Sequence, residues 1–214
     1  MNVLTIEIVS DIVCPWCYIG TRRLDAALAE VRREFPGFEC ETLWRPFFLN
    51  PDTPPEGEPY LPFLEHKFGG PERVAALFER VRQAGSAYGL DFPFEKILVR
   101  ANTLQAHRLI FWAQQQGNAR PLVDRLFAAQ FVNGENISDP ELLAVIAGET
   151  GYNVDAVRCY LASDQDVAVV RELEREGRQQ GINMVPTFVL NKRHVIVGAE
   201  NPSVLAAAIF QTLA

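Results

Sequence analysis

The segment Cys14-Pro15-Trp16-Cys17 stands where one predicted element ends and the next begins. Before it, residues 3–9 alternate in polarity and are rich in Val and Ile, which predicts a β-strand. From Pro15 onward, apolar residues recur at helical spacing until Pro36-Gly37 ends the pattern. Residues 38–45 have the pattern of a second strand. Together these elements predict a right-handed βαβ unit with parallel strands.

The chain changes character after this unit. Residues 50–62 contain five prolines, which predicts a rigid extended connection without a regular element. An apolar stripe predicts a helix from Pro71 to Val81, and residues 101–116 are apolar on more than one face, as in a helix packed on several sides. Further helices are expected over 139–149, after a capping box at Ser138-Asp139, and after the N-caps Asn153 and Ser163, the last running towards Gly181.

Strand character returns near the end of the chain. Residues 187–190 and 195–197 flank a polar turn and predict an antiparallel hairpin, and a last helix is expected over 202–213. The predicted order is therefore βαβ, a long all-helical insertion, and ββα, which is an α/β fold. We expect one discontinuous domain over residues 1–50 and 182–214, and an inserted helical domain over 51–181.

Composition excludes several classes of protein. With 48% hydrophobic and 22% charged residues among 214, the chain has the composition of a globular protein, not of a disordered one. Its net charge of -7 argues against a nucleic-acid binder. The N-terminus has no signal-peptide pattern, and no window has the roughly 20 apolar residues of a membrane helix. We expect a cytoplasmic protein without membrane contact, whose cysteines stay reduced.

A Cys-x-x-Cys segment between a strand and a helix is typical of a thioredoxin-like redox motif. At the helix N-terminus, unpaired N–H groups and the helix dipole stabilise a thiolate on Cys14, which makes it a nucleophile. Cys17 lies about one turn further along and can resolve a mixed disulfide. Three other interpretations compete: inert buried thiols, a zinc site, and a c-type haem site. The isolated Cys40 and Cys159 offer no paired zinc ligands, and Tyr18 stands where haem attachment needs His, so the redox interpretation is preferred and no metal is expected.

The segment Met184-Val185-Pro186-Thr187 places a proline directly before the hairpin strand. Thioredoxin folds keep a cis-proline at this point, facing the cysteines. A trans proline at a strand entry is the alternative. We expect a cis Val185–Pro186 bond close to the Cys14 sulfur, with the backbone of Val185 available to an extended substrate.

These motifs resemble those of a known family. The resemblance also includes Ser10-Asp11, Arg45-Pro46-Phe47, Asn102-Thr103, Ala106-His107-Arg108 and Ile137-Ser138-Asp139-Pro140. Over residues 4–213 the chain is similar to the cytoplasmic FrnE-like branch of the DsbA family. The resemblance implies a thioredoxin fold with a helical insertion and thiol–disulfide oxidoreductase activity. The kappa-class glutathione transferases and 2-hydroxychromene-2-carboxylate isomerases share this architecture but usually carry serine at the position of Cys14.

The resulting hypothesis is a protein disulfide oxidoreductase with Cys14 as nucleophile, Cys17 as resolving thiol and Pro186 as substrate-docking element. Further substrate contacts are expected from Trp16, Val185, Asn102 and His107. The expected substrate is a protein or small-molecule disulfide or thiol, and the expected redox partner is glutathione or a thioredoxin system. No cofactor is expected apart from glutathione as a co-substrate. The chain is expected to be a monomer or a homodimer. The alternatives are a glutathione-dependent isomerase or transferase of the 2-hydroxychromene-2-carboxylate isomerase (kappa) type, and a helical binding module with a vestigial site.

Two departures from the family pattern affect the chemistry. Ile8 stands six residues before the first cysteine, where related oxidoreductases often bury an acid, and the nearest acids are Glu7 and Asp11. Trp16 replaces the His of secreted DsbA enzymes, so a strongly oxidising potential is not expected. Cys40 and Cys159 are expected to act as small hydrophobic residues and not as a second redox pair.

Overall fold

The computed structural model describes residues 3–213. The chain divides into two compact units, of which the first joins the residues up to Phe47 with those from Leu173 onward, and the second is Phe48–Glu172. The sequence predicted that the helical domain ends at residue 181, whereas the second unit ends at Glu172. The C-terminal half of helix α8 (Val167–Gln179) belongs to the first unit, where it lines a cavity together with the strands.

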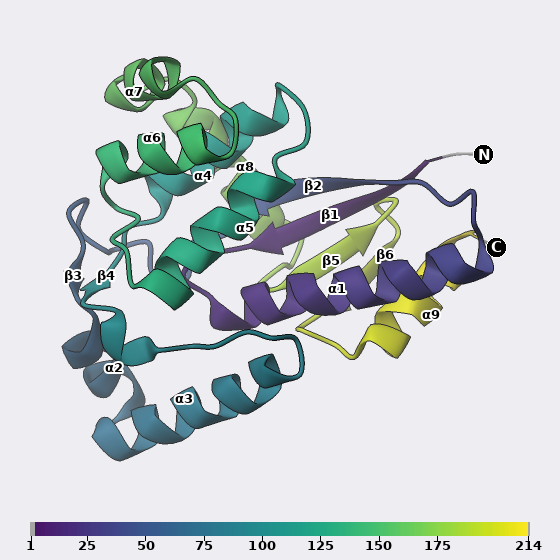
Figure 1. Ribbon diagram of the computed structural model, residues 1–214, viewed down its shortest axis with the longest axis horizontal. Coiled ribbons are helices and arrows are strands. Elements are labelled where there is room, and N and C mark those ends of the chain that lie inside the picture. The colour runs from purple at the N-terminus through teal and green to yellow at the C-terminus, as the bar shows by residue number, and fades with distance from the viewer. Residues whose placement is uncertain (1–2, 214) are drawn as a thin grey trace. The chain divides into compact units, whose positions relative to one another are not determined.

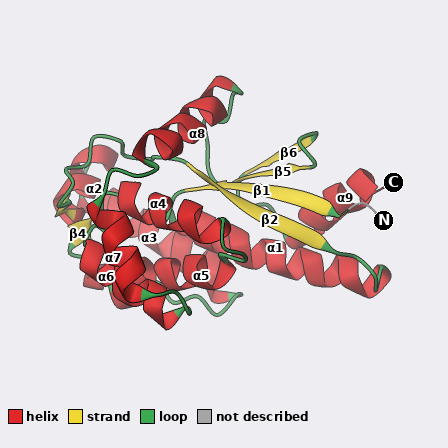
Figure 2. Ribbon diagram, turned by 90° about the horizontal axis from the view of Figure 1, so that it is seen from above, coloured by secondary structure: helices red, strands yellow, loops and turns green. Residues whose placement is uncertain are grey.

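A four-stranded sheet in the order β2-β1-β5-β6 organises the first unit (Figure 1). Its strands are β1 (Leu4–Ser10), β2 (Cys40–Pro46), β5 (Thr187–Leu190) and β6 (His194–Val197). Strand β2 is parallel to β1, whereas β5 is antiparallel to β1 and to β6. Helices α1 (Pro15–Glu34) and α9 (Pro202–Leu213) lie side by side on one face of the sheet (Figure 2). The predicted βαβ and ββα halves of a thioredoxin fold are therefore confirmed.

The strand register decides which side chains meet the helices. Ile8 pairs with Phe188, which pairs with Ile196, and this row faces α1 and α9. On the same face of β1, Leu4 and Ile6 are completely buried. Because side chains alternate along a strand, the residues between these positions face the opposite side of the sheet. A residue's place in β1 thus decides whether its side chain lies near α1.

The β5–β6 hairpin turns at Asn191 and Lys192, as the polar turn in the sequence predicted. Both residues have positive φ angles, 47° and 57°, as the first and second positions of a type I′ turn require. The backbone N–H of Asn191 donates to the carbonyl of Thr5 at 2.8 Å, and its side-chain oxygen accepts from the N–H of Thr5 at 2.9 Å. These bonds fix the hairpin to the start of β1.

The second unit is helical apart from a two-stranded antiparallel sheet, β3 (Glu58–Pro59) with β4 (Val99–Arg100). Its helices are α2 (Tyr60–Phe68), α3 (Pro71–Ser86), α4 (Leu104–Gln114), α5 (Arg120–Ala128), α6 (Pro140–Glu149) and α7 (Val154–Ala162), with a 3-10 turn at Phe94–Lys96 and a π-helical segment at Ala129–Asn133. Phe92 lies at the centre of its core, with ring centroids 5.5 Å from Phe94 and 5.6 Å from Phe131. Among the described residues, no helix combines the length and apolarity that crossing a membrane requires.

Several predicted helix starts are confirmed. The side chain of Asp139 accepts from the backbone N–H of Glu141 at 2.9 Å, which caps α6. The side chain of Asn153 accepts from the N–H of Ala156 at 2.9 Å, which caps α7. Capping depends on a few neighbouring residues, so the sequence alone can reveal it.

Other predictions for this unit were wrong. The proline-rich segment 50–62 does contain regular structure, because β3 forms there and α2 begins at Tyr60 with Pro62 in its first turn, where a missing N–H costs no helical bond. Ser163 ends α7 and does not begin α8, which starts four residues later at Val167. Helix α5 and the π-helical segment were not predicted at all.

Candidate active site at the start of helix α1

Cys14 is the N-cap residue of α1. Its backbone is extended, with φ -98° and ψ 109°, and Pro15 occupies the first helical position. The carbonyl of Cys14 accepts from the N–H of Cys17 at 3.0 Å, while its own N–H donates to the carbonyl of Asp11 at 3.0 Å. These bonds fix the turn that joins β1 to α1 and hold the first sulfur where the helix dipole favours negative charge. Both thiols are unbonded to each other and buried, with Cys14 5% and Cys17 1% exposed.

Pro186 lies beside this turn. The Val185–Pro186 peptide bond is cis, the isomer that the sequence predicts. The Cys14 thiol donates a weak hydrogen bond to the carbonyl of Val185, with 3.9 Å between sulfur and oxygen. The carbonyl of Pro186 accepts from the N–H of Gly198 at 2.7 Å, which ties the proline to the end of β6. The structure therefore brings Cys14 next to the segment that precedes β5.

Gly20 makes this proximity possible, although no pattern in the sequence points to its role. A Cβ atom at this position of α1 would lie 2.8 Å from Cγ of Pro186 and 3.3 Å from Cζ of Phe188. Real Cβ contacts do not come as close as 2.8 Å. Only glycine lets the first turns of α1 approach Pro186 so closely.

The surroundings of the Cys17 thiol shift its pKa. Burial raises the pKa of Cys17 well above its usual value of 9.0, and Cys14 raises it further through a hydrogen bond and through its charge. The Ser10 side chain and the Asp11 backbone N–H lower the pKa of Cys17 but do not outweigh burial. Cys17 therefore keeps its proton at neutral pH.

Two acidic residues, Glu7 and Asp11, lie near the motif in sequence. Ile8 points into the core, where it is 1% exposed. Glu7 faces the opposite side of the sheet and pairs with Arg45 at 2.7 Å. Asp11 is fully buried, and a hydrogen bond from its backbone lowers the pKa of Cys17. Proton transfer at Cys17 therefore does not use a carboxylate at the position of Ile8.

A model of the DSBA-like thioredoxin domain matches residues 5–210. The chain belongs to the DsbA-like thioredoxin family. A probable DsbA oxidoreductase of Streptomyces coelicolor is 31% identical in sequence and superposes with a TM-score of 0.88, over 98% of this chain and 90% of that chain. The DsbA-like fold with a helical insertion is thus established, as the sequence predicted.

Two more distant structures share this DsbA-like fold. The cytosolic disulfide reductase DsbM of Pseudomonas aeruginosa, solved with glutathione, is 18% identical with a TM-score of 0.66, and the match covers 98% of each chain. A 2-hydroxychromene-2-carboxylate isomerase is 15% identical with a TM-score of 0.70, over 98% of this chain and 96% of that chain. At such low identity the likeness concerns the fold alone. It does not choose between redox chemistry and isomerisation.

The other predicted contact residues of this DsbA-like chain have structural roles in their own units. Trp16 is half-buried in the first unit. In the second unit, the Asn102 amide donates to the carbonyl of Thr53 at 2.7 Å and caps the start of α4. His107 is buried and meets the ring of Phe48 edge-on, with centroids 5.3 Å apart. Their contact with substrate stays a prediction.

The remaining cysteines do not form a second redox pair. Cys40 is half-buried, and Nη2 of Arg32 lies 3.8 Å from its sulfur. Burial raises the pKa of the Cys40 thiol, and the charge of Arg32 opposes this rise. Cys159 is exposed, so it is not the core residue that its apolar neighbours suggested. Among the described residues, no group of His, Cys, Asp or Glu is arranged to hold a metal ion.

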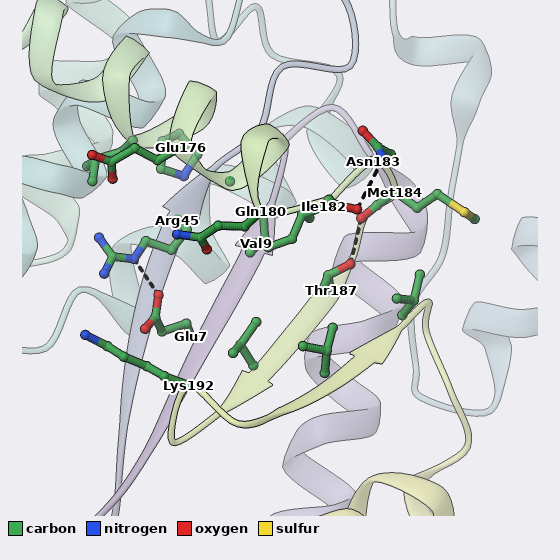
Figure 3. A pocket seen from close by; sticks show the side chains of 17 residues that line it. Glu7, Val9, Arg45, Glu176, Gln180, Ile182, Asn183, Met184, Thr187 and Lys192 are labelled. Carbon is green, nitrogen blue, oxygen red and sulfur yellow. Dashed lines mark hydrogen bonds and ion pairs between the residues drawn. The ribbon is translucent and has the colours of Figure 1, made fainter.

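A cavity of about 750 Å³ lies on the sheet face opposite α1, between the strands and the C-terminal half of α8 (Figure 3). Val9, Val189 and Val195 line it, together with the Glu7–Arg45 ion pair. Met184, 63% exposed, lies at the same cavity, two residues before Pro186. The volume of this cavity is in the range of small-molecule sites, which run from roughly 300 to 1,000 Å³.

Proposed function

We propose that this chain is a dithiol–disulfide oxidoreductase that works through Cys14 and Cys17. The observation that carries the proposal is the position of the Cys14 sulfur, at the N-cap of α1 and 3.9 Å from the carbonyl of Val185. A helix N-terminus favours a thiolate, and the thiolate is the form that attacks disulfides. Membership of the DsbA-like family supports the same chemistry.

The reaction consists of two exchanges. The Cys14 thiolate attacks a substrate disulfide, an S–S bond forms between Cys14 and the substrate, and the second substrate sulfur leaves as a thiolate and takes up a proton. Cys17 then loses its proton and attacks the Cys14 sulfur, so that a Cys14–Cys17 disulfide forms and the remaining substrate sulfur leaves as a thiol. The substrate gains two electrons and two protons, which the protein loses. A thiol such as glutathione, or a thioredoxin system, restores the dithiol by the reverse steps.

The backbone next to Pro186 is the proposed docking element for an extended substrate. The Val185 carbonyl already contacts the Cys14 thiol, so a chain that pairs with Val185 would present its sulfur to Cys14. Trp16 belongs to the same turn and adds a side-chain contact. Glutathione is the proposed small co-substrate, which the glutathione-containing structure of the related DsbM supports. The proposed location is the cytoplasm, where thiols are kept reduced.

The test uses the full chain carrying Cys40→Ala and Cys159→Ser, so that only the motif reacts. Mixed with dithiobis(nitrobenzoate), an aromatic disulfide that releases a coloured thiolate, it should release one thiolate when Cys14 attacks and a second when Cys17 resolves the mixed disulfide. With Cys17→Ala in addition, only the first release should remain. If Cys14→Ala kept the fast first release, Cys14 would not be the nucleophile and the proposal would be wrong.

The direction of electron flow follows from the reduction potential of the pair, measured in glutathione buffers. A value close to about -270 mV indicates a reductase and one near about -120 mV an oxidase. We expect the more reducing value, because Trp16 supplies no positive charge to stabilise the Cys14 thiolate. A glutathione-dependent isomerase would instead keep its turnover of an aromatic substrate after Cys17→Ser and would not catalyse disulfide exchange.

A further inference from the structure

Strand β6 is an outer strand of the four-stranded sheet: within residues 3–213, it has β5 on one side and no strand on the other (Figure 1). Its sequence, His194-Val195-Ile196-Val197, contains no proline and no Lys, Arg, Asp or Glu. Proteins usually protect such an edge with charged residues or proline, because its open backbone groups can pair with another chain. The other outer strand, β2, carries charges at Glu41 and Arg45. The edge at β6 lacks this protection.

The hydrogen bonds to β5 decide which backbone groups of β6 point outward. The N–H of Gly198 donates to the carbonyl of Pro186 at 2.7 Å, so the backbone groups of Gly198 face β5. Because these groups alternate in direction along an antiparallel strand, those of Ile196 face β5 as well. The N–H and C=O groups of Val195 and Val197 therefore point away from β5, towards the open edge.

The side chains at these two positions are also exposed. Val195 is 57% exposed and Val197 is 47% exposed. They stand opposite Val189 and Thr187 of β5 and line the cavity on the face away from α1. Branched apolar side chains beside open backbone groups supply both parts of a strand-pairing surface, the hydrogen bonds and the apolar contact.

The two ends of β6 carry opposite charges. Lys192 and Arg193 precede the strand and are exposed, whereas Glu200 follows it and is exposed as well. An antiparallel strand of the same sequence brings its negative end to the positive end of the first strand, at both ends of the pair. A parallel copy would bring like charges together. The charges therefore match a second copy of this chain in the antiparallel orientation.

We propose that two copies of this chain associate through β6, antiparallel about a two-fold axis, so that their sheets join into one. The register follows from the open backbone groups. With Ile196 of each copy at the axis, Val195 lies opposite Val197 of the second copy, and the outward N–H and C=O groups of both residues are paired. A pair centred on Val195 would need the N–H of Arg193, which already donates to the carbonyl of Leu190 at 2.9 Å.

The same register agrees with the charges and with the side chains. Each position lies opposite the one equally far from Ile196 on the other copy, which places Lys192 opposite Glu200 of the second copy. Directly opposite residues lie on the same face of a sheet, so Val195 of one copy contacts Val197 of the other on the cavity face. The exposed valines of each copy are thus covered, and the second copy adds apolar side chains to the rim of the cavity.

Helix α9 gives the same partner a second uncharged surface. It follows β6 and packs against it, and its twelve residues include no charged side chain. Val204, Ala207 and Gln211 are exposed along one side of the helix. The exposed side of a surface helix normally carries charged residues. A two-fold axis perpendicular to the sheet puts α9 of both copies on the same face of the joined sheet.

The test measures the mass of the full chain by sedimentation velocity at several micromolar concentrations, in dithiothreitol so that no disulfide joins two copies. The wild type should have twice the mass of one chain. Val197→Pro removes an outward N–H from each copy without removing a bond to β5. It should raise the dissociation constant of the dimer about 10-fold or more, because two hydrogen bonds between the copies are lost. Val197→Thr, which keeps the N–H and the branched shape, is the matched control and should stay dimeric.

An exchange of charges tests the register and does not depend on the folding of Val197→Pro. At low salt, Lys192→Glu alone and Glu200→Lys alone should each raise the dissociation constant about 10-fold, since two attractive contacts become repulsive. A mixture of these two variants should form mixed dimers with an affinity close to that of the wild type. One variant is negative at both positions and the other is positive at both, so opposite charges meet again.

The outcomes decide the proposal. A chain that stays monomeric at every concentration would overturn it and would leave the edge at β6 to an extended segment of another protein. A dimer with the same dissociation constant in Val197→Pro as in the wild type would overturn the assignment to β6. Failure of the mixed charge variants to associate would overturn the antiparallel register. None of these measurements reads the cysteine pair, so the proposed function is tested separately by the thiolate release.

Discussion

Replacing Gly20 by Ala should destabilise this protein, although Ala at an ordinary helical position is more favourable than Gly. A Cβ at Gly20 would stand 2.8 Å from Cγ of Pro186, whereas carbon atoms in contact are about 3.5–4.0 Å apart. The proline cannot easily withdraw, because it is buried and its carbonyl is bonded to Gly198. Phe188, 3.3 Å from the same point, is completely buried as well.

The magnitude follows from two opposing contributions. Overpacking a well-packed site costs about 1–3 kcal/mol. The higher helix propensity of Ala returns about 0.5–1 kcal/mol. The free energy of unfolding of Gly20→Ala should therefore fall by about 1 kcal/mol, and by no more than about 2.5 kcal/mol. The first thiolate release should slow as Pro186 and Val185 are pushed away from Cys14.

The assay is equilibrium unfolding in urea under reducing conditions, with Gly177→Ala as the control. Gly177 lies in α8, and a Cβ there would meet no atom within 4 Å. This variant should gain about 0.5–1 kcal/mol from propensity alone. If Gly20→Ala were as stable as Gly177→Ala, α1 would not be packed against Pro186 as described, and the reasoning would fail.

Two further predictions concern buried and paired charges of the second unit. The Arg108 side chain is completely buried and donates to the carbonyls of Tyr160, Ser163 and Gln165. In urea unfolding, Arg108→Met should therefore lower the free energy of unfolding by about 3 kcal/mol or more, and Arg108→Lys should not restore the wild-type value. The Arg125 guanidinium, through its hydrogen bonds, lowers the pKa of Glu135 below its ordinary value of 4.5. A lowered folded-state pKa stabilises the protein above the unfolded value, and this contribution is lost as pH falls through the folded value. Arg125→Met should therefore have a lower free energy of unfolding than wild type at pH 7, and this difference should shrink below about pH 4.5. If urea unfolding gave the same difference at pH 7 and pH 3, the Arg125–Glu135 pair would not be its cause.

The elements that could be predicted from the sequence are those with local signals. Strand β1 and helix α1 have clear periodicities, and α6 and α7 begin at side-chain caps within three residues of the bonds they make. The hairpin at Asn191 follows from turn chemistry of the same short range. These features need no knowledge of what packs against them.

The features that were missed depend on distant parts of the chain. Helix α2 begins within a proline-rich segment because Pro62 falls in its first turn, and β3 exists only because β4 pairs with it some forty residues later. The start of α8 is shifted because Arg108 binds the carbonyls that end α7, more than fifty residues away in sequence. No local pattern contains this information.

The same distinction applies to the candidate site. Cys14 and Cys17 could be found because their spacing is itself the signal, and Pro186 because a hairpin follows it. Gly20 could not, since its role depends on the approach of α1 to Pro186. Glu7 cannot take the place of an acid at Ile8 for a related reason, because it lies one position away on β1 and points to the other face of the sheet.

The resolving cysteine also bears on the choice between the two enzyme classes. An isomerisation leaves the number of electrons in its substrate unchanged, so it needs one sulfur or hydroxyl near the bound thiol and no second cysteine. Dithiol exchange needs a second sulfur that stays protonated until a mixed disulfide forms and then ionises. Cys17 is buried, and that burial raises its pKa, which Cys14 raises further. A second cysteine one helical turn after Cys14 that keeps its proton in the resting dithiol meets the requirement of disulfide exchange, whereas isomerisation has no use for it.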